Sequence, residues 1–163
     1  MNPEEVQSLF AAQLNVFDPI SGNPTDADLA QLCEELITNL IPLPYNVEKV
    51  IHNLLGLVMY KEYYEQRYCS KLPTSTKPAV YNESIPNNAT NVARAKDEAV
   101  HKPKIADYQL FAAAERETRV FILAVAENTW VRKFRETTMF YTAVAPLELL
   151  DHLQKKYASA SML

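Results

Sequence analysis

The sequence has only two glycines, Gly22 and Gly56, among its 163 residues. Two glycines are too few for the glycine-rich loops that cradle phosphates, or for a Gly-x-Ser-x-Gly nucleophile turn. Cys33 and Cys69 are the only cysteines, and they form no Cys-x-x-Cys pair or zinc-type spacing. The sequence therefore contains no catalytic or metal-binding motif of these kinds, and we expect neither a cofactor nor a small-molecule substrate.

Long apolar runs and a secretory leader are also missing. The longest apolar runs, Leu54–Tyr60 and Val120–Ala126, are far shorter than the roughly 20 residues that span a bilayer. The first ten residues carry Glu4 and Glu5 where a signal peptide would have basic residues. We therefore expect a cytoplasmic protein without a membrane partner.

Basic residues are nearly absent from the beginning of the chain. Residues 1–50 hold eight acids and one base, Lys49, for a charge of −7, whereas the remainder holds 15 bases and 12 acids, for +3. The two parts can attract each other within one chain or between chains. A surplus of three is too small to indicate nucleic-acid binding by itself, because phosphate binding uses a dense basic stripe.

Prolines, ten in the whole chain, and a helical spacing of apolar residues organise the first half. We predict a helix that begins at Asn2-Pro3, because proline suits the first turn and the acids that follow suit its positive end. A loop should follow, and Thr25 should cap a second helix that ends near Pro42. Asn46 is expected to cap a further apolar helix, and 59–68 to form a short one.

The second half contains the strongest helical pattern, over Ile105–Val131. Asn87 or Asn88 is expected to cap a helix upstream of it, and whether Pro103 kinks one helix or separates two is open. Residues 120–126 are apolar nearly all round, which predicts a central position in the fold. Pro146 should begin a last helix with four inward-facing leucines. One line of the long helix is predicted to face the core: Phe111, Ala114, Thr118, Phe121 and Val125.

The predicted fold is all-α, an irregular bundle of about five to seven helices with a proline-rich connector. We divide the chain into an N-terminal helix and loop (1–24), a helical part (25–68), the connector (69–88), a helical core (89–158) and a frayed tail (159–163).

Only weak chemical signals stand out. Glu98 and His101 have the Glu-x-x-His spacing of di-iron bundles, but such a site needs a second pair and the sequence has none, so His101 is interpreted as structural. Three tyrosines, Tyr60, Tyr63 and Tyr64, are either core residues or part of a protein interface, where tyrosine is enriched.

A mixed basic and aromatic segment is the one candidate for RNA contact. Arg132, Lys133 and Arg135 alternate with Trp130 and Phe134, as cations and rings do in single-strand binders. A helix end with its rings in the core and its charges outside explains the same pattern. We favour this second interpretation, because Trp130 falls in the apolar register, and we keep Trp130 and Phe134 as candidate interface residues.

Four segments follow one another along the chain: HNLLGLVMYKEYY (52–64), AVAENTW (124–130), FYTAVAP (140–146) and LLDHL (149–153). Over about residues 25–157, these segments in this order resemble the Gag-like capsid region of copia-type LTR retrotransposons. The chain departs from the family in having Asn53 and Leu54 where a glycine and a histidine are usual, and it has no Cys-x-x-Cys-His-Cys zinc knuckle. The resemblance implies self-association into particles that package element RNA.

Three functional hypotheses follow. The first is a non-catalytic, self-associating capsid-like fragment that also contacts RNA. The second is a helical adaptor that binds another protein in a groove near the tyrosines and stays monomeric without it. The third is a small enzyme, which would need a pocket with perturbed titratable groups, and the sequence shows no such set.

Overall fold

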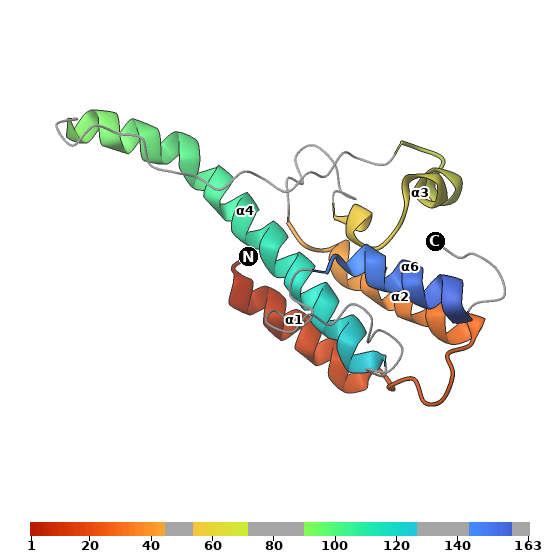
Figure 1. The fold of residues 1–163 in the computed structure, drawn as a ribbon. Helices are drawn as coiled ribbons and strands as arrows, with labels where there is room; N and C mark the ends of the chain where they lie inside the picture. Colours follow the sequence, from red (N-terminus) through yellow and green to blue (C-terminus); the bar gives the residue numbers. More distant parts are fainter. Residues whose placement is uncertain (45–53, 72–89, 127–143, 158–163) are drawn as a thin grey trace.

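The computed structural model of the chain describes residues 1–44, 54–71, 90–126 and 144–157. These residues form five α-helices and one 3-10 turn and contain no strand, so the predicted all-α bundle is confirmed (Figure 1). The elements are α1 (Pro3–Val16), α2 (Asp26–Leu40), η1 (Leu55–Leu57), α3 (Lys61–Tyr68), α4 (Asn91–Val125) and α6 (Pro146–Tyr157).

The first two helices begin where their capping residues predict. The Asn2 side chain accepts a hydrogen bond from the Glu5 backbone N–H (2.9 Å), and the Glu5 carboxylate accepts one from the Asn2 backbone N–H (2.8 Å). Thr25 and Asp28 form the same reciprocal pair at 3.2 and 2.9 Å. Each capping box satisfies two backbone groups that a helix start leaves unpaired, which fixes where α1 and α2 begin.

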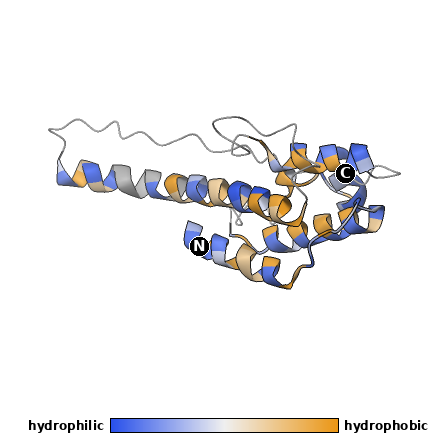
Figure 2. Cartoon of the chain, turned by 60° about the horizontal axis from the view of Figure 1, so that its bottom comes forward, coloured by the Kyte–Doolittle hydropathy of each residue, from blue (hydrophilic) through white to orange (hydrophobic). Residues whose placement is uncertain are grey.

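The core lies where α1, α2, α4 and α6 face one another, and Figure 2 shows hydrophobic residues concentrated there. Phe121 of α4 is 1% exposed and meets two rings edge-on, those of Phe10 (6.4 Å between centroids) and Phe17 (5.5 Å). The backbone N–H of Ile20 donates to the carbonyl oxygen of Val125 (3.2 Å). These contacts place the end of α1 beside the end of α4, and the start of α1 lies beside the middle of α4, so the two helices run parallel.

The short elements η1 and α3 lie where the sequence predicted a helix from Asn46 and a short helix over 59–68, and they match that prediction only in part. Residues around Gly56 form the single 3-10 turn η1, with Leu55 and Leu57 buried. The start of the helix predicted from Asn46 lies outside the described residues. Helix α3 ends at Cys69, which adopts a left-handed conformation with φ of 53°, a common way for a helix to stop.

Helix α4 runs unbroken for 35 residues, so Pro103 lies inside one helix. Its N-cap is Thr90, whose side chain accepts from the Ala93 N–H (3.2 Å), and not Asn87 or Asn88 as predicted. A serine- or threonine-type cap is as effective as asparagine, and sequence alone did not distinguish the three positions. The helix ends at Val125 with Ala126 as its extended C-cap, one residue inside the predicted span, and residues 127–131 of that span lie outside the described residues.

One face of α4 follows the prediction and another does not. All five residues of the predicted line from Phe111 to Val125 are buried. Val120, however, is 48% exposed and Ala124 is also exposed, so residues 120–126 are not central on all sides. Arg116, Val120 and Ala124 are spaced four residues apart and share the outer face, because the neighbouring helices cover only one side of α4.

Helix α6 begins at Pro146 as predicted and buries Leu149, Leu150 and Leu153. It packs against α4, α2 and η1. No helix in the described ranges is both long and apolar enough to cross a membrane.

Candidate interaction surface

The three candidate tyrosines of the α3 region differ in their exposure. Tyr64 is 2% exposed and its ring lies 4.7 Å from the ring of Tyr68, centroid to centroid. Tyr63 and Tyr68 are half-buried against the core, while Tyr60 is 38% exposed. Tyr64 and its neighbours thus contact the chain's own core, and Tyr60 is the one candidate with a surface open to a partner.

Tyr60 precedes α3 and lies near the acidic and basic side chains of α6. Burial of the hydroxyl raises the pKa of Tyr60, and the charge of Asp151 raises it further. Asp151 itself pairs with Lys155, with 2.8 Å between Oδ2 and Nζ. Tyr60 therefore ties the start of α3 to α6 and remains protonated at neutral pH.

An ion pair joins α3 to α2. The Arg67 guanidinium donates through both terminal nitrogens to the Glu34 carboxylate, with 2.9 Å between Nη2 and Oε2. This bidentate geometry holds the pKa of Glu34 below its usual value and raises that of Arg67. Glu34 remains 53% exposed and Arg67 30% exposed, so solvent screens the pair.

A second charged cluster lies on α4 and is more deeply buried than its sequence suggests. Arg119 is 8% exposed and donates from Nε to the carbonyl oxygen of Val144 (2.6 Å) and from Nη2 to Glu115 (3.3 Å). Glu117 is 6% exposed and accepts from Nε of Arg116 (2.8 Å). Each of these buried charges has a partner, because an unpaired buried charge is costly. Arg119 also contacts the residue that lies two positions before α6 begins. In the sequence, these residues are visible only as members of a cluster of four charges, Glu115, Arg116, Glu117 and Arg119.

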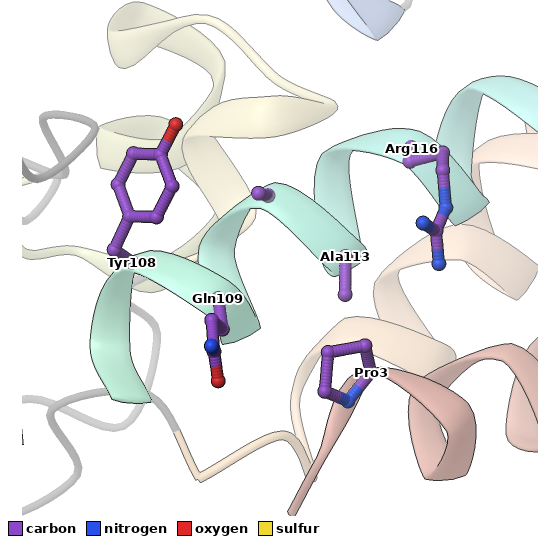
Figure 3. A pocket seen from close by; sticks show the side chains of 6 residues that line it. Pro3, Tyr108, Gln109, Ala113 and Arg116 are labelled. Carbon is purple, nitrogen blue, oxygen red and sulfur yellow. The ribbon is translucent and has the colours of Figure 1, made fainter. Parts of the chain in front are cut away.

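An open groove of about 410 Å³ lies between the start of α1 and the middle of α4. Figure 3 shows Pro3 facing Ala113, with Gln109 and Arg116 along the same stretch of α4 and Tyr108 turned away from Pro3. Its lining combines small apolar surfaces with one cation, a composition suited to a side chain of another protein. This groove is distinct from the tyrosine region where the sequence predicted one.

The first half of α4 is the feature that sequence reasoning missed. We define the arm as residues 91–104 of this helix. Figure 1 shows the arm extending past the start of α1 and away from the other described helices, and Figure 2 shows the same extension from another direction. Its described side chains, 91–96 and 102, are exposed or half-buried, and Leu110 is the first buried residue among the described side chains of α4.

The charge asymmetry predicted from sequence falls on separate parts of the fold. Residues 1–44, which form α1 and α2, carry seven acids and no lysine or arginine. The arm carries four bases and two acids: Arg94, Lys96, Lys102 and Lys104 against Asp97 and Glu98.

Other predicted sites fall outside what the structure describes. This holds for the basic set Arg132, Lys133 and Arg135 and for Trp130 and Phe134. It also holds for most of the connector 69–88, for the tail 159–163 and for the side chains of Glu98 and His101. Within the described ranges, no three His, Cys, Asp or Glu side chains are grouped to hold a metal ion.

No protein-family model matches this chain, and neither a curated protein nor a solved structure gives a significant match. The similarity of residues 25–157 to Gag-like capsid regions therefore stays a prediction from the sequence.

Proposed function

We propose that this protein is a non-catalytic, self-associating helical protein of the Gag-like capsid type, acting in the cytoplasm. The observation that carries the proposal is the arm of α4, a long helical extension beside a compact bundle of opposite charge. A helix segment that leaves its own core gains stability through contacts with another molecule, because short isolated helices are marginal in water.

The segments that resemble Gag-like regions support this proposal by packing together. Residues 54–64 of the first segment form η1 and the start of α3, and residues 149–153 lie in α6. Helix α6 contacts η1, and Leu55 and Leu149 are fully buried. A capsid fragment needs such a rigid unit, since repeated contacts between copies require one fixed surface.

RNA packaging is the second part of the proposal. Arg132, Lys133 and Arg135 are the residues that would contact RNA, with Trp130 and Phe134 as neighbouring rings. Changing the three bases to glutamine should leave folding intact and weaken binding of single-stranded RNA in a fluorescence anisotropy titration. RNA affinity equal to that of the wild type would remove this segment as the site.

The groove between α1 and α4 favours one alternative, a helical adaptor that binds a protein partner. Arg116 at its edge is 54% exposed and Pro3 offers apolar surface, which suits an acidic or amphipathic peptide. An adaptor of this kind would stay monomeric at high concentration. Self-association with no added partner separates the first function from this one.

Electron microscopy of the purified, concentrated protein tests the capsid-type function. We expect regular assemblies of uniform size, in greater number when single-stranded RNA is added. Fields of single small molecules under all conditions, with and without RNA, would contradict the proposal.

A further inference from the structure

We propose that the arm of α4 docks on the acidic helices α1 and α2 of a second copy of this chain. The inference rests on the proposed self-association and names the surfaces that carry it. Each copy offers one arm and one acidic surface, so two copies can exchange arms about a twofold axis to form a dimer.

The arm, in its described side chains, lacks the interior packing that the rest of α4 has. It is 14 residues long, about 21 Å of helix. None of its described side chains is buried, and Val92 is 67% exposed. Pro103 lies within it, where proline removes a helical hydrogen bond. Contact with a second molecule would stabilise a helix of this kind.

Charge selects the acidic helices as the surface that receives the arm. The arm has a net charge of +2, whereas α1 carries two acids and α2 carries four, with no lysine or arginine in either helix. Glu4 and Asp18 are exposed at the two ends of α1. α1 is also 14 residues long, so the arm can lie along its full length. Opposite charges steer such surfaces together and set their register.

A single chain does not bring these surfaces together. α1 and α4 run parallel, and Pro3 at the start of α1 lies beside Gln109 and Ala113. The arm therefore continues beyond the start of its own α1 (Figure 1). A second copy is the partner whose acidic helices the arm can reach.

Charge reversal on the arm tests the docking. The variant Lys96→Glu with Lys102→Glu changes two exposed arm lysines. The control variant Lys71→Glu with Lys156→Glu makes the same change in net charge at exposed lysines outside the arm. By sedimentation velocity, we expect the arm variant to raise the dissociation constant between copies about tenfold or more, and the control by less than about threefold.

A mixing experiment makes the test specific. Glu4→Lys with Asp18→Lys should weaken self-association by itself, and mixing this variant with the arm variant should restore assembly, because both contacts of the mixed pair join opposite charges. Thermal melting of each variant checks that it folds. Restored assembly in the mixture supports the exchange of arms.

The outcomes separate the docking from the proposed function. If the wild type associates and the arm variant associates as tightly as the control variant, the docking is wrong while self-association stands. If the wild type stays monomeric, both are wrong. If the arm variant associates normally but loses binding to single-stranded RNA, the arm is an RNA contact and not an interface between copies.

Discussion

Arg119 of α4 donates a hydrogen bond from Nε to the carbonyl oxygen of Val144, at 2.6 Å, across 25 positions of sequence. The guanidinium is almost fully buried and also reaches Glu115 on its own helix. Val144 lies two residues before α6 begins, so this one side chain anchors the point where the last helix joins the bundle.

Arg119→Met should therefore destabilise the protein by about 2 kcal/mol, since it leaves a buried carbonyl without its charged donor. Lys71→Met is the matched control, because Lys71 is an exposed cation outside the arm. The control should change stability by less than about 0.5 kcal/mol. Denaturant unfolding followed by circular dichroism measures both, and equal midpoints would contradict the anchoring role.

Phe121→Ala should cost about 3–5 kcal/mol, because it removes a ring that contacts Phe10 and Phe17 in the core. The neighbouring change Val120→Ala is a control on the same turn, since Val120 is 48% exposed. Its expected cost is below about 1 kcal/mol. Thermal melting distinguishes the two, and similar effects would mean that the outer and inner faces of α4 are wrongly assigned.

Glu34→Gln tests the pair between α2 and α3 through its dependence on pH. Arg67 lowers the pKa of Glu34, so the pair stabilises the fold above the ordinary value of 4.5 and that contribution is lost as pH falls below it. The variant should be less stable by about 0.5 kcal/mol at pH 7. The difference should shrink progressively as pH falls below 4.5. Glu35→Gln, one position along, is the control and should show no such pH-dependent difference.

The two cysteines should react at very different rates. Burial raises the pKa of the Cys33 thiol to about 12, with the adjacent Glu34 charge adding to it, whereas Cys69 is exposed at the end of α3. A disulfide reagent at pH 8 should modify Cys69 quickly and Cys33 only after unfolding. Rapid modification of both thiols in the native protein, or of Cys33 alone in Cys69→Ser, would contradict this packing.

The beginnings of three helices could be read from sequence, because their signals are local. Asn2, Thr25 and Pro146 each act within their own first turn, and capping and proline geometry depend on few neighbours. The inward line of α4 was also predictable, since the spacing of apolar residues records which face is covered.

The outer face of α4 was not predictable, because it depends on where the bundle ends. Val120 and Ala124 are apolar but point away from the neighbouring helices, and nothing in a single sequence tells which side stays uncovered. The burial of Glu117 and Arg119 was missed for a related reason. Charged residues are normally exposed, and their partners here, Arg116 and the Val144 carbonyl, become visible only in three dimensions.

The candidate surfaces show the same limit. The excess of acids at the start of the chain was evident in the composition. The basic arm was not, because Pro103 left open whether one helix or two preceded Leu110. Tyrosine enrichment indicated an interface or a core without choosing between them, and packing places Tyr64 in the core.

The most direct test of self-association is the mass of the purified chain in solution, measured by light scattering behind a sizing column over a range of concentration and salt. We expect the mass to rise above the 18.5 kDa of one chain as concentration increases, and to fall back as salt screens the charges. A constant 18.5 kDa under every condition would contradict the proposed function.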